Sequence, residues 1–286
     1  METLSKGFIV LLSHDVDVPL KYNFIGTLIE LNKSINLFLK LKFKESIKLF
    51  LKTFHSVFTN KNPYWQFENI MDLEKGYGFR STFFFCVKRR HKLDPYYNIN
   101  NKKIVAVIRK LDKEGFEIGL HGSYLSYKNL GYLKEEKRIL EKILGKEIIG
   151  IRQHFLNFSK DTPKLHEKAG FKYDSSYGFT DKIGYKDNKY SPFYFNELLE
   201  IPLVIMDGNL EKMKLSKEQA WTEIKKLIDF AKKNRCLISF NWHQRCLSEK
   251  EFPMFANLYK KILFYIKETN AEVLTAQQIY KKWQSR

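Results

Sequence analysis

The sequence predicts an α/β protein in which seven to eight parallel strands, alternating with helices, form a β/α barrel. Short runs rich in β-branched and aromatic residues alternate with helical segments along the 286-residue chain. Glycine stands where several of these helices should end, directly before the next apolar run. Seven or eight such units suit a barrel better than an open sheet. We therefore expect a single domain over residues 1–286.

Residues 7–176 carry five of the expected strands. The elements, in order, are a strand at 7–13, a helix at 66–78, a strand at 81–87, a helix at 102–115, a strand at 116–122, a helix at 133–145, a strand at 147–155, a helix at 159–170 and a strand at 171–176. The second half continues the alternation with a strand at 198–207, a helix at 216–234, a strand at 236–243, a helix at 252–269 and a strand at 271–276.

One segment interrupts this alternation. From about residue 21 to residue 62, the sequence LIELNKSINLFLKLKFKESIKLFLKTFHSVF is apolar and basic, with few acids. It fits a pair of amphipathic helices inserted after the first strand. One interpretation is a membrane-surface or partner-binding pair, since each basic residue near anionic lipid contributes about 1 kcal/mol. The other, which we favour, is an amphipathic pair that caps the barrel.

Composition excludes several classes of protein. The net charge of +18 could mark an anionic partner, but the lysines are spread over the whole chain, as biased base composition would produce. There is no RNP-like aromatic sequence, zinc-finger spacing or Walker loop, so we expect no nucleic-acid partner. No apolar run is long enough for a membrane span or typical of a signal peptide. Cys86, Cys236 and Cys246 lack C-x-x-C spacing, which favours a reducing cytoplasm over a disulfide framework.

Nearly every predicted strand ends in an acid, a histidine or an arginine. The strand ends read SHDVD, LHG, IRQH, YDSS, MDG and NWH. In β/α barrels the carboxyl ends of the strands carry the active site. One core histidine would explain one such residue but not six, so we expect these side chains to gather at one site.

Two carboxylates at the end of the first strand suggest a cation. Asp15 and Asp17 project to one face by strand alternation, and His14 projects to the other. Carboxylates this close repel unless one binds a cation or a proton. If a metal takes one, the other is free to act as a general base on water. The simpler alternative is that D-x-D caps a turn.

The remaining strand ends add an arginine and three histidines. Arg152, on the same face as His154, would neutralise and orient carboxylates. His243 is a candidate proton donor near neutral pH. A lone histidine such as His121 is more often a core residue, but the whole set suggests metal-assisted hydrolysis with one metal set, one base and one acid.

In this order the residues resemble the NodB-type polysaccharide deacetylases, carbohydrate esterases with a distorted (β/α) barrel, and more closely a variant branch associated with surface-polysaccharide biosynthesis. The resemblance runs from LLSHDVD through RSTFFF to FNWH. It implies that Asp15 is the catalytic base and Asp17 a metal ligand. It also implies that Arg152 orients the base and that the N–H of Phe155 helps to hold the oxyanion.

The later motifs complete the expected site. YDSSYGF implies that Asp174 is an orienting carboxylate, and FNWH implies that His243 is the general acid, with Trp242 beside it as a substrate or oxyanion contact. Asp207, in LLEIPLVIMDGNL, receives no role.

The sequence departs from the resemblance at one metal ligand. In EIGLHGSYLSY only His121 matches a ligand, and Leu125 stands where the family has a second histidine. A zinc site normally needs three protein ligands. We hypothesise that His154, in the place of a family proline, compensates, so that Asp17, His121 and His154 bind a divalent metal, zinc by the resemblance.

The resemblance therefore implies a metal-dependent hydrolase that removes an N-acyl group, N-acetyl by preference, from a sugar. In the cytoplasm or at the inner face of the membrane, such an enzyme would act on a nucleotide-linked or lipid-linked sugar. The alternative is a catalytically degenerate member of the same fold that binds sugar or scaffolds a biosynthetic complex; Leu125 favours it, and the complete base and acid set opposes it.

Overall fold

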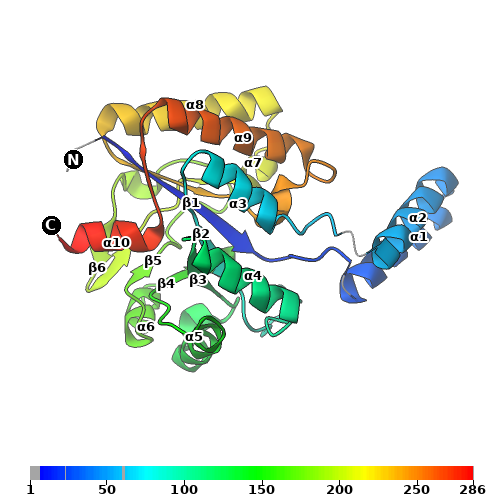
Figure 1. Cartoon of the computed structure of the whole chain (residues 1–286), viewed down its shortest axis with the longest axis horizontal. Helices are drawn as coiled ribbons and strands as arrows, with labels where there is room; N and C mark the ends of the chain where they lie inside the picture. The colour runs from blue at the N-terminus through cyan, green and yellow to red at the C-terminus, as the bar shows by residue number, and fades with distance from the viewer. Residues whose placement is uncertain (1–6, 23, 60–61, 286) are drawn as a thin grey trace.

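A single curled sheet forms the centre of the computed structural model, which describes residues 7–22, 24–59 and 62–285 (Figure 1). The strand order is β6-β7-β5-β4-β3-β2-β1-β9-β8, and β10 also pairs with β1. The strands are β1 Ile9–Val16, β2 Thr82–Phe85, β3 Glu117–Gly122, β4 Gly150–Gln153, β5 Tyr173–Asp174, β6 Phe193–Phe195, β7 Leu198–Glu200, β8 Ile205–Met206, β9 Leu237–Asn241 and β10 Glu272–Leu274.

The predicted fold class is confirmed, with two more strands than expected. Strands β1 to β5 and β7 to β9 run parallel to their neighbours along the path. The two additions are β6, which is antiparallel to β7, and a strand gained because the expected 198–207 strand forms β7 and β8. The path begins at β6 and ends at β8, so the part of the barrel that the structure describes is open between these two strands.

Helices cover the outside of the sheet (Figure 1). The triple phenylalanine of β2 shows how this core forms, because Phe83 and Phe85 point outward to the helices and Phe84 points inward. The helices are α3 Phe67–Gly76, α4 Lys102–Lys113, α5 Leu130–Leu144, α6 Thr162–Lys168, α7 Asp207–Lys212, α8 Lys217–Asn234, α9 Pro253–Glu268 and α10 Ala276–Gln284.

The strand expected at 198–207 is wrong as a single element. The chain forms β7 and β8 instead, and these lie toward opposite ends of the strand path, so residues 201–204 cross the opening of the barrel. Pro202 has no N–H for a strand ladder. Its carbonyl accepts a hydrogen bond from Ser239 Oγ, which in turn accepts one from the N–H of Val204, so one serine satisfies the backbone on both sides of the break.

The basic segment forms a helical hairpin of α1 Phe24–Leu39 and α2 Phe43–Thr59; residues 23, 60 and 61 of the expected 21–62 segment lie outside the described residues. Figure 1 shows the hairpin extending away from the barrel, at the end of the chain leaving β1. Among the described helices, none is both long and apolar enough to cross a membrane.

Candidate active site

The carboxyl ends of four strands, β4, β3, β1 and β9, bring the polar residues together, with only β2 between β3 and β1. Asp15 is near the end of β1 and Asp17 follows it, while His121 lies in β3 directly opposite Arg152 in β4. His154 follows β4, and His243 follows β9, which pairs with β1 on its other side. Because parallel strands end on the same edge of a barrel, these side chains converge above the sheet.

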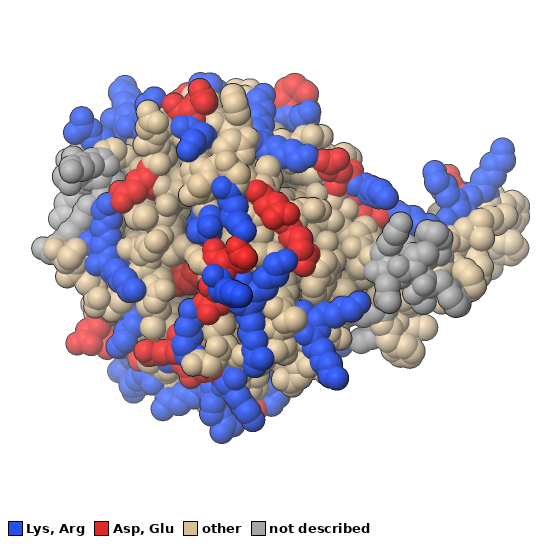
Figure 2. All heavy atoms as spheres, viewed as in Figure 1, with Lys and Arg blue, Asp and Glu red and all other residues tan. Residues whose placement is uncertain are grey.

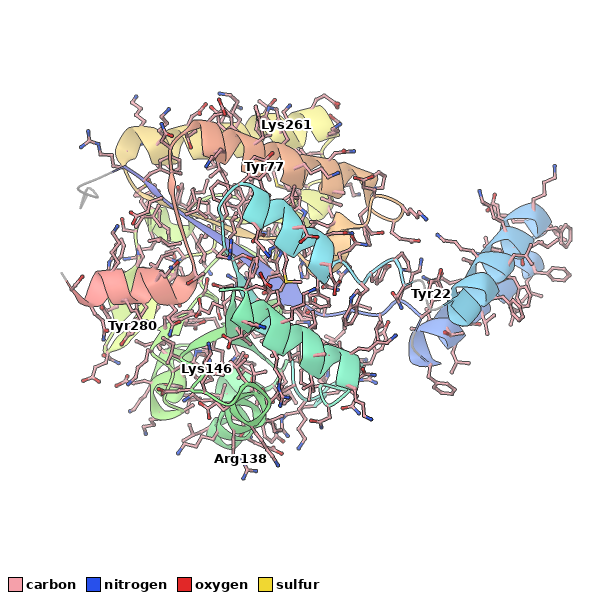
Figure 3. All side chains as sticks on the ribbon, in the orientation of Figure 1. Tyr22, Tyr77, Arg138, Lys146, Lys261 and Tyr280 are labelled. Carbon is pink, nitrogen blue, oxygen red and sulfur yellow. The ribbon has the colours of Figure 1, made fainter. Side chains whose placement is uncertain are left out.

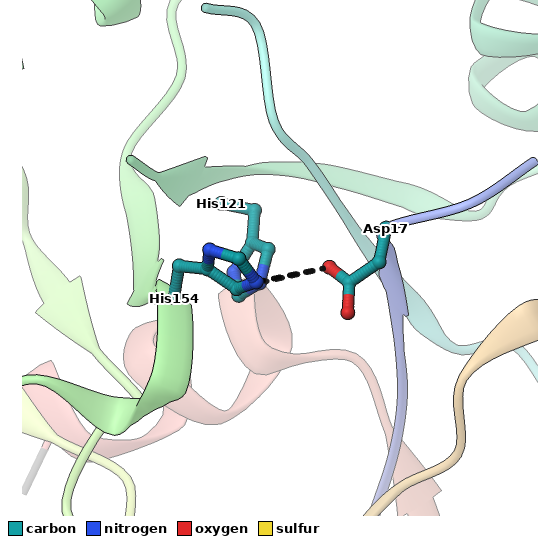
Figure 4. Close-up of side chains that lie close together, drawn as sticks. All are labelled: Asp17, His121 and His154. Carbon is teal, nitrogen blue, oxygen red and sulfur yellow. Dashed lines mark ion pairs between the residues drawn. The ribbon is translucent and has the colours of Figure 1, made fainter. Parts of the chain in front are cut away.

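Asp17, His121 and His154 form a compact group of potential metal ligands (Figure 4). Asp17 Oδ1 lies 3.4 Å from His121 Nε2 and 3.7 Å from His154 Nε2. The three ligand atoms all lie within 4.8 Å of one another. The structure thus brings together the three residues that the sequence assigned to a metal.

The surrounding hydrogen bonds orient this group as metal ligands are usually oriented. The Nδ1–H of His121 donates to the carbonyl of Arg152 at 3.0 Å, which leaves the Nε2 lone pair facing Asp17. Nδ1 of His154 donates to Asp94 Oδ1 at 3.2 Å, with the same result. Second partners of this kind fix the tautomer and ring orientation of metal-binding histidines.

Asp17 provides an independent indication that the group fits a cation. Its Oδ1 is buried and has no hydrogen-bond partner among the described residues. Burial alone would raise the pKa of Asp17, but the imidazoles of His121 and His243 beside it lower that pKa well below its usual value. A buried, ionised oxygen without a donor is costly unless a cation binds it. One carboxylate oxygen and two imidazole nitrogens are a donor set that suits zinc.

Asp15 is held as a buried carboxylate beside this group. Its Oδ1 accepts a hydrogen bond from Arg152 at 3.1 Å, and its Oδ2 accepts one from Asn241 Nδ2 at 2.7 Å. Burial would raise the pKa of Asp15, but the charges of His121, Arg152 and His243 together lower it. Asp15 is therefore ionised at neutral pH and can accept a proton.

Arg152 is fully buried, and its orientation comes from residues that sequence reasoning missed. It donates to Ser13 Oγ and Ser175 Oγ, both at 2.8 Å, and to the carbonyl of Ser175. Its guanidinium also lies 4.5 Å from the ring centroid of Phe84. These contacts fix the orientation of the Arg152 guanidinium group, which binds Asp15.

His243 has the second carboxylate partner in the site, Asp207. Nδ1 of His243 lies 2.6 Å from Asp207 Oδ1, and its backbone N–H donates to Asp207 Oδ2 at 2.9 Å. Nε2 lies 3.3 Å from Asp17 Oδ2. Burial would lower the pKa of His243, but the charge of Asp207 and the hydrogen bonds to both aspartates raise it to about 10. The imidazole is therefore protonated at neutral pH and can donate a proton.

Asp174 and Trp242 do not occupy the places expected for them. Asp174 accepts hydrogen bonds from Ser176 Oγ and from Nδ1 of His166, so its bonds go to residues beneath the site instead of to Asp15 or Arg152. Trp242 is 0% exposed and packs against Tyr259, so it cannot contact a substrate. Strand alternation explains this correction, because residue 242 faces away from residues 241 and 243.

Phe155 lies at the rim of the site. Its φ of 59° turns the chain sharply after β4, and its ring is 51% exposed beside Tyr124, at a centroid distance of 5.6 Å. Leu125 precedes the short 3₁₀ helix η1 Ser126–Lys128 and has no place among the ligand atoms described above.

Comparison with known proteins agrees with this geometry. A family model described as WbmS-like polysaccharide deacetylase matches residues 95–247, a span that includes His121, His154 and His243 but begins after Asp15 and Asp17. No curated protein sequence gives a significant match.

Several solved structures share the fold. A structure described as a polysaccharide deacetylase from Mycobacterium smegmatis superposes with a TM-score of 0.64 and 15% identity, covering 99% of this chain and 93% of that one. Puue allantoinase superposes with a TM-score of 0.64 and 14% identity, covering 97% of this chain and 90% of that one. The chitin deacetylase of Colletotrichum lindemuthianum superposes with a TM-score of 0.50 and 14% identity, covering 98% of this chain and 90% of that one. At these identities the likeness establishes the fold alone, and a fold hosts more than one reaction.

Proposed function

Because the chain belongs to the WbmS-like polysaccharide deacetylase family, we propose that it is a metal-dependent hydrolase that removes an N-acetyl group from a sugar during surface-polysaccharide biosynthesis. One observation carries the proposal: an ionised carboxylate, Asp15, and a protonated imidazole, His243, flank a single group of potential metal ligands. A base and an acid on either side of a Lewis-acid site are what amide hydrolysis requires.

Asp17, His121 and His154 are the residues that would hold the cation. When bound, a divalent ion such as zinc supplies Lewis acidity to the acyl oxygen and lowers the pKa of water to roughly 7. Asp94 and the carbonyl of Arg152 keep the two imidazoles turned toward Asp17.

The protein's own groups then move the protons. Asp15, held by Arg152 and Asn241, accepts the proton of the attacking water as its oxygen bonds to the acyl carbon. His243 gives its Nε2 proton to the nitrogen as the C–N bond breaks, so the products are a free amine and acetate. Asp207 keeps the other ring proton in place and stabilises the imidazolium. The N–H of Phe155 is the proposed oxyanion donor, a contact worth about 3 to 4 kcal/mol.

The proposed substrate is an N-acetylated sugar carried on a nucleotide or on a lipid, with the protein working at the inner face of the membrane. The rival is a degenerate member of the fold that binds sugar without turnover, for which the missing histidine at Leu125 is the supporting observation. A binding protein has no use for the separately supported base and acid, which favours the enzyme.

The deciding experiment measures acetate release by the zinc-loaded, purified chain from a panel of water-soluble N-acetylhexosamine nucleotides and oligosaccharides. We expect release that depends on both Asp15 and His243, tested as Asp15→Asn and His243→Ala. Stoichiometric metal with no acetate released from any member of the panel would favour the binding protein.

A further inference from the structure

The α1–α2 hairpin exposes its large apolar side chains and buries its small polar ones. Ser34 of α1 and Ser46 of α2 are buried between the helices, and each hydroxyl donates to the other residue's carbonyl, at 2.9 and 2.7 Å. By contrast, Phe24 is 81% exposed and Leu39 is 71% exposed. A helix pair in water normally packs its apolar faces together. Small residues at the helix contact with large apolar ones outside are typical of helix pairs in lipid.

The exposed apolar residues form one continuous face. Apart from Ile29, which is 39% exposed and lies outside it, they occupy at 100° per residue a sector of about 100° on each helix, roughly a quarter turn from the contact serines in the same rotational sense. Because the helices are antiparallel, equal offsets place both sectors on the same side of the hairpin. The residues are Phe24, Leu28, Ile35, Phe38 and Leu39 on α1, and Phe43, Ile47, Phe50, Leu51 and Phe54 on α2. The rings of Phe38 and Phe43, 5.1 Å apart, join the two sectors across the turn.

Lysines line the hairpin outside this apolar face. Lys44, Lys48 and Lys52 recur every four residues along α2 and form a stripe next to the apolar sector. Figure 2 shows basic side chains gathered along one edge of the hairpin, above a broad uncharged area. Of the two acids between residues 24 and 59, Glu30 is buried against Lys33, so Glu45 is the exposed one. The hairpin is thus amphipathic and cationic.

We propose that the hairpin docks the protein on a bilayer that contains anionic lipid. The apolar face enters the boundary between headgroups and acyl chains, and Lys44 and Lys48 contact the headgroup phosphates. The helices are too short and too charged to cross, so the hairpin lies in the interface. A second copy is a poorer occupant of the face, because it would bring the same lysines of two hairpins together without countercharge.

Docking by the hairpin brings the candidate active site near the membrane. Asp17 and Phe24, the first residue of α1, are seven positions apart in the sequence. Glu251 fixes the base of the hairpin through Lys21 at 2.6 Å and Lys52 at 2.5 Å, and it follows closely on η4 Gln244–Leu247, which begins beside His243. In Figure 3, Tyr22 marks the place where the chain from the barrel reaches the α1–α2 hairpin. This substrate inference rests on the proposed function: a site held at the membrane favours a lipid-linked sugar over a nucleotide-linked one as the substrate.

Flotation of the full-length protein with vesicles tests the docking. We expect flotation with phosphatidylcholine vesicles that contain phosphatidylglycerol, weakening as salt increases, and little with phosphatidylcholine alone. Phe50→Asp/Phe54→Asp and Lys44→Glu/Lys48→Glu should each lose at least tenfold in bound fraction. Their matched controls on the barrel, Phe264→Asp and Lys232→Glu/Lys233→Glu, change exposed residues of the same kind and should float as the unmodified protein does.

Three results would overturn the docking proposal: no flotation with anionic vesicles, a Phe50/Phe54 variant that floats normally, or a stable dimer in solution that this variant converts to monomer. The last would assign the face to a second copy. The substrate inference is tested separately, with an N-acetylhexosamine on a polyprenyl diphosphate in the same vesicles. The hairpin variants should lose turnover on it and keep turnover on a water-soluble N-acetylated sugar. Equal turnover on the vesicle-borne substrate would contradict the substrate inference, whereas the loss of both activities in Asp15→Asn bears only on the proposed function.

Discussion

His243 lies between two aspartates, with its Nδ1 2.6 Å from Asp207 Oδ1 and its Nε2 3.3 Å from Asp17 Oδ2. Asp207 therefore sets the orientation and charge of the imidazole. Asp17 lies at Nε2, the nitrogen that would face a substrate. His243 thus carries the proton, and a separate residue, Asp207, orients it.

Removing the charge of Asp207 should move the alkaline limit of activity to lower pH. The pKa of His243 is raised to about 10, so the acid form predominates below that value and is lost as the pH rises through it. In Asp207→Asn the pKa falls, by about 1 to 3 units for a close charge, and the alkaline limb of kcat should shift down with it. A pH–rate profile checks this, with the exposed Asp161→Asn as control. An unchanged alkaline limb would rule out His243 as the acid.

Loss of His154 should abolish tight metal binding. The residue is one of three potential ligands, and a zinc site with two protein ligands is rare. Metal content after dialysis and zinc affinity by competition with a chelator measure the effect. The control is His91→Ala, a histidine that stacks on Tyr124 and is absent from the ligand group. Unchanged affinity in His154→Ala would remove this residue from the site.

Asp94 should influence the metal without touching it. Its Oδ1 accepts from both His154 Nδ1 and the backbone N–H of Tyr124, the latter at 2.6 Å. Asp94→Asn should therefore weaken metal affinity about 10- to 100-fold, the range found when such supporting partners are changed. Titration calorimetry with zinc separates this graded loss from the complete loss in His154→Ala. Equal losses in both variants would instead indicate that Asp94 holds the local fold.

Asp15→Asn should preserve the fold and the metal while reducing kcat by about 10²- to 10⁴-fold, the usual contribution of a general base. The amide keeps the shape of the side chain and one hydrogen-bond acceptor for Arg152 or Asn241. Acetate release and metal content are measured on the same preparation, and the exposed Asp181→Asn is the control. Turnover near that of the unmodified protein would exclude Asp15 as the base.

Arg152→Met should lower the free energy of unfolding by about 3 to 5 kcal/mol, because it leaves the buried Asp15 carboxylate without its cation. Arg152 and Asp15 are 0% and 3% exposed. Arg138, labelled on the outer surface of α5 in Figure 3, is the matched control, and Arg138→Met should change stability by less than about 0.5 kcal/mol. Urea denaturation measures both, and equal effects would contradict the buried pair.

The sequence was informative where function follows strand periodicity. Asp15, Asp17, His121 and His243 could be located because each stands at the end of an apolar run, and parallel strands bring such ends together. Trp242 fails by the same periodicity, since its neighbours at 241 and 243 occupy the inner face.

The supporting residues could not be located in this way. Asp94 lies in an irregular segment between β2 and α4 that has no periodic pattern, and only the folded chain brings it to His154. Asp207 is 36 positions before His243 and follows a two-residue strand, so no local spacing connects the two. The strand-end sequence MDG indicated that Asp207 lies near the site, but it did not indicate that Asp207 pairs with His243.

The open side of the barrel also bears on self-association. An incomplete barrel has two sheet edges, and long, flat edges pair readily with the edges of other molecules and start aggregation. Here the outermost strands of the path, β6 and β8, are three and two residues long. Edges this short offer too few backbone groups to template a foreign strand, so the barrel can remain unclosed without becoming a nucleus for aggregates.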